Sequence, residues 1–573
     1  MVNIIIDGKP LQVEENTTIL QAARQNGIDI PTLCYLEWLN EIGACRICVV
    51  EVKGMDRLVS SCNTKVREGM EILTKTHKVR MARKINAQLI LSQHNCDCPT
   101  CPRSGNCRLQ DISAKLGIQD TPYSHKVPQE PWNWNFPLIR DGSKCIKCMR
   151  CIQVCNEIQG MHVWDLVNTG KRTRVGVRDN LDISEVNCTL CGQCITHCPV
   201  GALQARDDTD KVWDALSDPE ITTIVQVAPA VRTAWAETTG MEREVATPEK
   251  MAAALRSLGF DYVFDTNFSA DLTIMEESAE FIDRMSHKED HVWPMFTSCC
   301  PGWVRFVKED YPELLPNIST AKSPMAMFSA VAKSYYAKIL DKDPNKICVV
   351  AVMPCLAKKY ECDVDEVNSE PDVKDTDIVI TTREFNRMLN MANVDITSLK
   401  PEKFDEPLGM GTGGGIIFGT TGGVMEAAVR NAYYNLTGED PDPDTFITWK
   451  FVDRWKEAEC KIGDTTVRLA VTSGLASTRA LVEEVKNGNV HYDFIEIMAC
   501  PGGCSGGGGQ PIHEGEELAW SRGNYLHQLD KKSKLRVPHQ NPFIQDLYNN
   551  FMDAPLSEKA EHYLHTDQSK WKL

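Results

Sequence analysis

Residues 347–355 read ICVVAVMPC, an apolar run that is typical of a buried strand and that ends in a proline and a cysteine. The same arrangement recurs at 494–500, FIEIMAC, and in shorter form at 293–300, WPMFTSCC. Strand-like runs of this kind alternate with helical segments, which indicates an α/β domain. Because ligands of α/β sheets bind beyond the carboxyl ends of the strands, we expect these cysteine loops to meet in one crevice.

The same α/β pattern extends from about residue 210 toward the C-terminus. The expected strands are 224–228, 262–264, 347–352, 378–381, 467–471 and 494–497, and the expected helices include 248–258 and 274–285. Residues 515–573 are polar and helix-prone. We therefore expect them to form a C-terminal cap that wraps the α/β domain.

The composition indicates a reduced, metal-binding chain. Its 24 cysteines are clustered in repeated Cys-x-x-Cys pairs rather than spread like a disulfide framework. The N-terminus has no leader-like basic and apolar segment, and no run approaches the roughly 18 apolar residues of a membrane span. The net charge of −17 argues against nucleic acid as a partner. We therefore expect a cytoplasmic protein without a membrane span.

Residues 1–76 begin with a strand-like run at 2–6, a turn and a second strand, and a helix follows at 19–26 after Thr17 and Thr18. A Cys-x-x-Cys pair with one further thiolate on each side can enclose a 2Fe–2S rhomb, with structural zinc as the alternative. The predicted ligands are Cys34, Cys45, Cys48 and Cys62.

A second motif places one histidine before three cysteines, His94-x3-Cys98-x2-Cys101-x5-Cys107. One imidazole and three thiolates suit a 4Fe–4S cluster with a single histidine ligand. Cys96 lies close enough in sequence to compete with His94 as the fourth ligand. The spacing alone leaves both ligand sets open.

The strongest local signal is a repeat of four cysteines. The run Cys145-x2-Cys148-x2-Cys151-x3-Cys155 recurs as Cys188-x2-Cys191-x2-Cys194-x3-Cys198. In two-cluster bacterial ferredoxins the fourth cysteine of each run binds the other cluster. The predicted 4Fe–4S ligand sets are therefore Cys145, Cys148, Cys151 and Cys198, and Cys188, Cys191, Cys194 and Cys155. Four cluster sites in series indicate that electrons travel through them to or from a further site.

Three segments carry a resemblance to a known family. TSCCPGW (297–303), MPCLAKKYE (353–361) and EIMACPGGCSGGGG (496–509) resemble the signature segments of iron-iron hydrogenases. The order of the preceding cluster motifs resembles that of clostridial-type enzymes with four accessory clusters. The N-terminal motifs also resemble the start of complex I and hydrogenase subunits, which favours His94 as a ligand. The resemblance covers essentially the whole chain and implies the reversible interconversion of protons, electrons and H2.

The resemblance also implies a multidomain α/β fold. The expected parts are a ferredoxin-like (β-grasp) 2Fe–2S domain at 1–76, a His/Cys 4Fe–4S domain at 77–126, a two-cluster bacterial ferredoxin-like domain at 127–209 and a two-lobed α/β catalytic domain at 210–573, with the cap at 515–573. The implied cofactors are one 2Fe–2S cluster, three accessory 4Fe–4S clusters and an H-cluster.

By the same resemblance, the H-cluster joins a 4Fe–4S cluster to a diiron subcluster that bears CO, cyanide and a dithiolate amine. Its implied ligands are Cys300, Cys355, Cys500 and Cys504, of which Cys504 bridges the two parts, and Lys358 is implied as a donor to a cyanide ligand. The implied pocket residues are Pro229, Ala230, Met325, Met353, Pro354 and Met498. Some relatives have glutamine where this chain has Met325, which leaves a hydrogen-bond donor at that position in question.

Cys299 stands directly beside the implied ligand Cys300. Two adjacent thiolates rarely bind the same small cluster, so we expect Cys299 to remain a free thiol that relays protons. The family's proton path then maps onto Glu277, Ser319, Glu280 and Arg284. The spacing of the three charged residues places them on one face of a helix, for which an ordinary ion-paired surface is the alternative interpretation.

Two other classes of protein share parts of this pattern. A non-catalytic iron–sulfur protein of cluster assembly would lack the full relay and signature loops, and a hydrogenase-like sensor would carry a signalling module. The expected partners are ferredoxin, or flavin/NAD- or formate-dehydrogenase subunits, and the maturation proteins of the diiron site. Residues 75–84 (KTHKVRMARK) suggest either a docking site for an acidic electron carrier or the solvated face of a connecting helix, and we favour the helix face.

Overall fold

The computed structural model describes residues 1–123, 130–371, 373–463 and 465–572, which form two compact units. The first unit comprises residues 1–157, 162–186 and 197–204. The second comprises residues 158–161, 187–196 and the chain from 205 to the C-terminus. Among the helices in the described ranges, none is long and apolar enough to cross a membrane.

The first unit begins with a mixed sheet in the strand order β2-β1-β5-β3-β4. Its strands are β1 (Val2–Ile6), β2 (Lys9–Val13), β3 (Val49–Val52), β4 (Val59–Ser60) and β5 (Glu71–Leu73). Helix α1 (Ile19–Gln25) begins after Thr18, whose side chain accepts a hydrogen bond from the Gln21 backbone in a capping box. Ile4 and Ile6 of β1 pack in one core with Leu20 of α1. Because successive side chains of a strand point to opposite faces of the sheet, these two residues define the face of the sheet that packs against the helix.

Short elements follow in the first unit around a longer helix. They are α2 (His77–Leu91), α3 (Arg108–Lys115), β6 (Leu138–Arg140), α4 (Arg150–Gln153), β7 (Trp164–Val167), β8 (Arg174–Val177) and β9 (Leu203–Ala205). Helix α2 is anchored to the sheet because the Arg83 side chain donates to Val49 O through Nε and Nη2, at 3.1 and 2.9 Å.

The second unit contains a parallel sheet in the order β11-β10-β13-β14. Its strands are β10 (Thr222–Val227), β11 (Tyr262–Asp265), β13 (Ile347–Met353) and β14 (Ile378–Thr381). Residues of α7 (Pro248–Ser257) and α13 (Thr382–Met391) share one core with this sheet, and residues of α8 (Asn267–Ser286) and α10 (Pro324–Val331) share another. Cover on both faces explains the nearly continuous apolar sequences of the strands.

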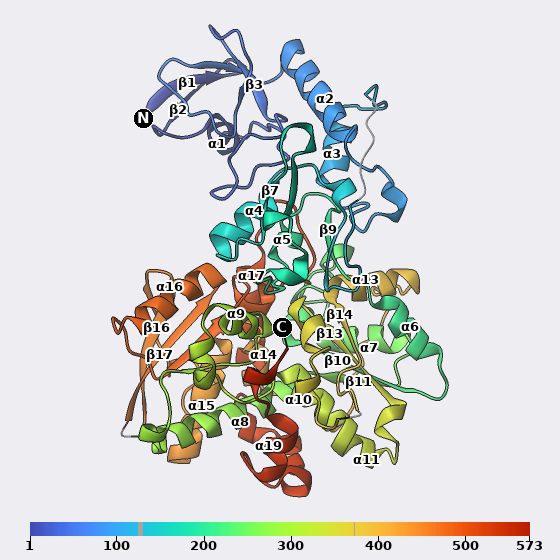
Figure 1. The fold of residues 1–573 in the computed structure, drawn as a ribbon, viewed down its shortest axis with the longest axis vertical. Helices are drawn as coiled ribbons and strands as arrows, with labels where there is room; N and C mark the ends of the chain where they lie inside the picture. The colour runs from blue at the N-terminus through green and yellow to red at the C-terminus, as the bar shows by residue number, and fades with distance from the viewer. Residues whose placement is uncertain (124–129, 372, 464, 573) are drawn as a thin grey trace. The chain divides into compact units, whose positions relative to one another are not determined.

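A second sheet in this unit has the order β12-β18-β17-β16-β15. Its strands are β12 (Met295–Phe296), β15 (Lys450–Val452), β16 (Trp455–Ile462), β17 (Thr465–Ser473) and β18 (Phe494–Met498). The first three strands in that order are parallel, and β16 and β15 continue the sheet antiparallel. Figure 1 shows the two sheets on opposite sides of this unit, with α10 and α14 (Gly413–Ile417) between them.

The remaining helices of the second unit cover and connect the sheets. They are α5 (Gln193–Thr196), α6 (Thr209–Ser217), α9 (Pro301–Asp310), α11 (Ala337–Ile339), α12 (Ala357–Glu361), α15 (Gly423–Thr437), α16 (Leu475–Lys486), α17 (Ala519–Lys532), α18 (Pro542–Leu547) and α19 (Glu558–Leu564). The last three form the expected helical C-terminal region, and residues of α18 and α19 share a core with α8 and α10.

The expected strands 262–264, 378–381 and 494–497 agree with β11, β14 and β18 to within a residue at either end. The expected helix 274–285 was too short, because α8 begins at Asn267. Residues 267–273 include asparagine, serine, aspartate and threonine, which favour caps and turns over helix interiors. Tertiary contacts override that preference: Asp271 is buried and accepts hydrogen bonds from the backbone and hydroxyl of Thr412.

Candidate active site

Three cysteine-bearing segments of the second unit meet beyond the ends of three strands. Cys355 follows β13, Cys500 follows β18, and Cys300 follows β12 and stands at the start of α9. Burial and then the charge of Cys300 raise the pKa of Cys355 to about 12. Burial raises the pKa of Cys504 as well, and Cys355 and Cys300 add to that effect. Burial also raises the pKa of Cys500, on which Cys355, Cys300 and Cys504 act, so the four thiols lie close enough to act on one another.

Close backbone packing surrounds the last of these thiols, in the short helix η14 (Gly503–Gly506) and the glycines that follow. Gly503 has φ +75°, and a Cβ added there would lie 2.8 Å from the backbone of Thr420. A Cβ on Gly507 would lie 2.1 Å from Pro354 O. Only glycine fits these positions, so the sequence GGCSGGGG is what lets the Cys504 and Cys355 loops approach each other.

The residues expected to line the pocket are all placed in the buried interior of this unit. Pro229 and Ala230 begin the short helix η7 (Pro229–Thr233) directly after β10, and Gln510 Nε2 donates to Ala230 O at 2.9 Å. Met353 and Met498 end strands β13 and β18. The remaining pocket residues are Pro354, which follows Met353, and Met325, which lies in α10.

Lys358, in α12, is placed next to the free thiol predicted at 299. Its Nζ donates to Cys299 O at 3.3 Å and forms an ion pair with Glu361. Burial acts to lower the pKa of Lys358, but the Glu361 carboxylate, together with Cys355 and Cys299, offsets this effect and the pKa rises. The lysine is therefore a permanently charged donor beside the Cys299 backbone.

Cys299 and Glu277 are both buried, and each lies within the electrostatic reach of the other. Burial raises the pKa of Cys299 well above its usual value, and the charge of Glu277 raises it further. Burial also raises the pKa of Glu277, to about 8, with Glu280 as the next cause. Neither Glu277 oxygen has a hydrogen-bond partner of standard geometry among the described residues, although the Ser319 hydroxyl lies near enough to act on its pKa.

The outer part of the predicted proton path is a connected set of polar groups. Ser319 Oγ donates to Glu280 Oε2 at 2.7 Å, and Arg284 Nη2 donates to Glu280 Oε1 at 2.6 Å. Arg284 lines a cavity of about 500 Å³, together with Thr320 and His565. All three helix residues of the path are buried, which contradicts the alternative of a solvated helix face.

Sequence reasoning assigned no role to Glu496, the first residue of the third motif. It lies in β18, is fully buried, and accepts hydrogen bonds from the backbone of Gly422 at 2.6 Å and of Met425 at 2.8 Å. Burial raises its pKa to about 7. A carboxylate in an otherwise apolar strand, FIEIM, is the signal that could have identified it. Through these bonds Glu496 fixes the start of helix α15 beside the cysteine loops.

One segment of the ferredoxin-like repeat belongs to the second unit and packs against the same loops. Cys191 O lies 3.6 Å from Cys500 Sγ, and Gln193 Nε2 donates to Gly506 O at 2.9 Å. Arg305 Nε, from α9, donates to Cys188 O at 3.0 Å. The thiols of Cys188, Cys191 and Cys194 are thus carried on a segment bonded directly to the Cys500 region, whereas Cys155 belongs to the first unit.

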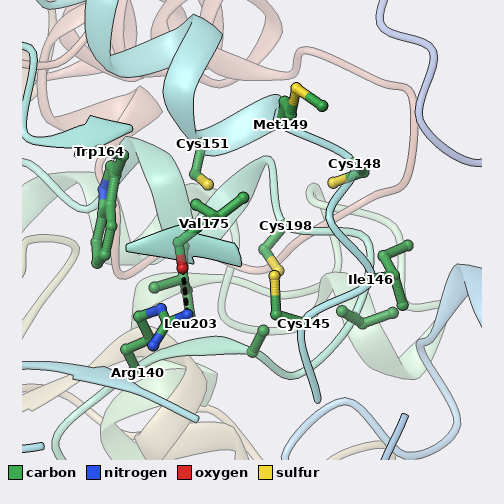
Figure 2. A pocket seen from close by; sticks show the side chains of 12 residues that line it. Arg140, Cys145, Ile146, Cys148, Met149, Cys151, Trp164, Val175, Cys198 and Leu203 are labelled. Carbon is green, nitrogen blue, oxygen red and sulfur yellow. Dashed lines mark hydrogen bonds between the residues drawn. The ribbon is translucent and has the colours of Figure 1, made fainter. Parts of the chain in front are cut away.

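In the first unit, the other predicted set of the repeat lines one pocket. Figure 2 shows Cys145, Cys148, Cys151 and Cys198 around it, with Trp164 and Arg140 at its edge. The set combines cysteines from the first run with the last cysteine of the second run. This is the exchange that the two-cluster pattern predicts.

The four N-terminal cysteines also lie together in the first unit. The thiol of Cys34 hydrogen-bonds with that of Cys45, which lowers the pKa of Cys34, and Cys62 does the same to Cys48. Arg150 donates through Nε to Cys34 O at 3.2 Å, so this loop is bonded to the helix that follows Cys148.

The predicted His/Cys ligands share a cavity of about 390 Å³, lined by His94, Cys98, Cys101 and Cys107. His94 Nδ1 lies 2.9 Å from Lys144 O. An Nδ1–H donated to that carbonyl leaves the Nε2 lone pair free to bind a metal. Cys96 lines the same cavity but is exposed, and its thiol donates to His94 O at 3.4 Å.

The described residues contain no set of three or more His, Cys, Asp or Glu side chains arranged to hold a single metal ion. The side chains of His94, Cys98, Cys101 and Cys107 surround a cavity of about 390 Å³, which has room for a group larger than a single ion. Two observations concern the lining of this cavity. A Cβ on Gly201 would lie 2.6 Å from Cys101 Sγ, and two nitrogens of Arg103 are buried beside the His94 cavity without a partner.

Models of known families match successive parts of the chain. They are the 2Fe-2S iron-sulfur cluster binding domain at 1–77, the NADH-ubiquinone oxidoreductase-G iron-sulfur binding region at 83–122, the 4Fe-4S dicluster domain at 144–202, the iron only hydrogenase large subunit, C-terminal domain at 221–508 and the iron hydrogenase small subunit at 516–569. The last two matches cover most of the second unit.

Individual proteins match over the full length. The chain is 46% identical to the NADP-reducing hydrogenase subunit HndD of Solidesulfovibrio fructosivorans, over 100% of this chain and 99% of that protein. It is 38% identical to iron hydrogenase 1 of Clostridium pasteurianum, over the whole of both chains. Among solved structures, an apo FeFe-hydrogenase from Chlamydomonas reinhardtii matches with a TM-score of 0.57 and 38% identity, and the match covers 63% of this chain and 98% of that one.

Proposed function

This chain belongs to the family of iron-only hydrogenases, and from that premise we propose how its residues interconvert protons, electrons and H2. The protein is an oxidoreductase that acts on H2 at an H-cluster, with iron–sulfur domains as the electron relay. When bound, the H-cluster supplies the redox-active irons at which H2 is formed and split. The chain's own residues hold that group, exclude water and move protons and electrons to it.

We propose that Cys300, Cys355, Cys500 and Cys504 bind the H-cluster. The observation that carries this assignment is the convergence of four thiols from three strand ends, beside a fifth, Cys299, that stays protonated. The glycines around Cys504 carry no side chains, so the backbone there can approach a bound group closely. Met353, Met498 and Met325 give the pocket soft, apolar walls, and Lys358 supplies a fixed positive donor.

Protons reach the site through a buried chain of carboxyl, hydroxyl and thiol groups. Arg284 holds Glu280 at the cavity through its ion pair, and Ser319 donates to Glu280. With a pKa of about 8, Glu277 is protonated at neutral pH and can pass its proton inward to Cys299. The high pKa of Cys299 makes its thiolate a strong base, so the thiol is quickly reprotonated after each transfer.

Electrons reach the site through the accessory clusters. We propose one 2Fe–2S cluster on Cys34, Cys45, Cys48 and Cys62, and three 4Fe–4S clusters on the sets predicted from the sequence, with His94 as the histidine ligand. The bonds that join Cys191 and Gln193 to the Cys500 region support the last transfer, from the second ferredoxin-type cluster to the H-cluster. Tunnelling rates fall steeply with distance, so this direct contact favours that cluster as the final donor.

We propose that the electron partner is a separate acidic redox protein that docks on α2. This helix contains no acidic residue, although the chain as a whole has a net charge of −17. Met81, Ile85 and Leu89 are exposed at intervals of four residues, which forms an apolar stripe on one face. The cations Lys78, Arg80 and Lys84 lie on the same helix. Exposed apolar residues among cations favour docking over the solvated face expected from the sequence.

The name of the relative HndD makes a flavin- and NAD(P)-binding subunit our first candidate for this partner, ahead of ferredoxin and a formate dehydrogenase. Maturation proteins would supply the diiron site, and we place the protein in the cytoplasm because of its many free thiols. The alternative of a non-catalytic assembly or sensor protein is disfavoured by the buried relay of Cys299, Glu277 and Glu280.

The test is to express the chain anaerobically with maturation proteins and to record infrared spectra and H2 evolution from reduced methyl viologen. We expect bands of bound CO and cyanide together with H2 evolution. Cys504→Ala should remove both and leave the accessory-cluster signals intact. Cys460→Ala, at a buried thiol of β16, is the matched control and should change neither. A folded, iron-loaded chain with neither bands nor turnover would overturn the proposal.

A further inference from the structure

The side chain of Arg103 is charged, buried and incompletely hydrogen-bonded. It follows Cys101 in the loop that leads to Cys107, and only 6% of its surface is exposed. Nε donates to Asn106 O at 2.7 Å. Nη1 and Nη2, in contrast, are buried without a hydrogen-bond partner among the described residues. No described carboxylate forms an ion pair with this guanidinium.

A guanidinium in this condition requires a partner. Leaving a buried donor unsatisfied costs about 1–3 kcal/mol, and more when the donor is charged. An unpaired buried charge is costlier than an unpaired neutral group, and for this reason buried arginines are almost always paired. Arg103 therefore indicates that a negatively charged acceptor belongs next to its two free nitrogens.

The position of Arg103 identifies that acceptor. The side chain lines the cavity of His94, Cys98, Cys101 and Cys107. Its stem packs beside Cys101, because a Cβ added at Gly201 would lie 2.6 Å from Cys101 Sγ and 3.7 Å from Arg103 Cγ. The acceptors that the proposed cluster would bring into this cavity are thiolate and sulfide sulfurs, and their negative charge fits the guanidinium.

We propose that Arg103 donates Nη1–H and Nη2–H to sulfur atoms of the His94-ligated 4Fe–4S cluster and thereby raises the reduction potential of that cluster. This inference rests on the proposed cluster assignment. Reduction adds one electron and hence one negative charge, with no bond formed or broken. A fixed positive charge and hydrogen bonds to the sulfurs stabilise the reduced form more than the oxidised form. Arg103 is thus a positioning and tuning residue of the electron relay.

The test is a redox titration of the complete chain, followed by electron paramagnetic resonance. His94→Cys first identifies the signal of this cluster, because replacing an imidazole ligand changes its spectrum. Arg103→Met removes the charge and the donors but keeps an apolar stem. We expect the equilibrium constant for reduction of this cluster to fall at least tenfold, a shift of about 59 mV for one electron. The other clusters should keep their potentials and act as internal controls.

Two further variants separate the possible outcomes. Arg103→Lys retains the charge without the guanidinium fork, and it should recover part of the lost potential. If Arg103→Met loses the cluster, the same comparison is made with Arg103→Gln, which retains a donor without the charge. An unchanged potential in a variant that keeps the cluster would overturn the role of Arg103. A wild-type chain without a histidine-ligated cluster would instead overturn the cluster assignment on which the inference rests.

Discussion

Replacing Cys299 with serine tests the central assignment, because it changes one atom of a buried side chain and removes its acidity. Cys299 is only 7% exposed, so solvent water cannot easily replace the thiol as a proton carrier. Besides Lys358, the groups whose charges act on it include Glu277, Cys300, Cys504 and Glu496. The second and third are proposed ligands, and Glu496 is held by the backbone of α15. Apart from Glu277, which precedes Cys299 in the proposed path, none of these groups is available as a substitute proton carrier.

The expected loss follows from this isolation. A positioned proton-transfer group contributes about 10²–10⁴-fold to a rate. At 1.36 kcal/mol per factor of ten, the barrier should rise by about 3–5 kcal/mol. Because serine is a far weaker acid than cysteine in the same buried position, we expect a loss near the upper end. The H-cluster ligands are unchanged, so the infrared bands of CO and cyanide should persist in shifted form.

The assay is H2 evolution from reduced methyl viologen, normalised to H-cluster content from the infrared spectrum. Cys362→Ser is the matched control, since Cys362 is also 7% exposed and hydrogen-bonds to Thr376 O, away from the path. It should keep wild-type turnover per H-cluster. Turnover within threefold of wild type in Cys299→Ser, with the H-cluster present, would refute the relay.

Three further perturbations test other parts of the molecule. The pKa of Glu277 is raised from 4.5 to about 8, so between these pH values the folded chain keeps a proton that the unfolded chain has lost. The contribution of Glu277 to the free energy of unfolding therefore falls as the pH rises from 4.5 to about 8. Glu277→Gln should reduce this pH dependence of stability and raise Tm at pH 8. It should also lower H2 evolution at least a hundredfold. A variant whose stability has the wild-type pH dependence would contradict the raised pKa. Lys359→Met removes the buried cation that pairs with two buried carboxylates, Asp208 and Glu384, so chemical denaturation should show a loss of about 3–5 kcal/mol. Lys211→Met, which removes an exposed partner of the same Asp208, should cost under about 1 kcal/mol, and equal losses would argue against this account. Reversing the three α2 charges at 78, 80 and 84 should raise the KM for an acidic ferredoxin at low salt at least tenfold and leave turnover with viologen unchanged, whereas an unchanged KM would count against docking there.

The N-terminal and parallel-sheet elements could be predicted from local patterns. The strand Val2–Ile6 is confirmed to the residue, and Thr18 caps α1 as its hydroxyl suggested. Strands β15 and β16 were not expected, because polar and charged residues such as those in WKEAECKI dilute the apolar signal of an antiparallel strand. In the folded chain β16 pairs antiparallel with β17, and β15 pairs antiparallel with β16.

The candidate site likewise has residues that the sequence could predict and residues that it could not. Spacing predicted the cysteine sets, and the structure places Cys145, Cys148, Cys151 and Cys198 around one pocket. Spacing could not reveal Arg103 or Glu496, because a single charged residue in a sequence is usually solvated. Their roles depend on burial and on the absence or presence of partners, which are properties of the folded chain.

The sequence by itself determined the family, the order of the domains and the identity of the cysteine motifs, because these follow from residue types at fixed short spacings. Only the tertiary structure decided that Glu277, Glu280 and Arg284 are buried rather than placed on a solvated helix face. The helical spacing is the same in both cases, and what differs is the packing around α8. Burial raises the pKa of Glu277, and desolvation by residues distant in sequence is the physical cause of that shift.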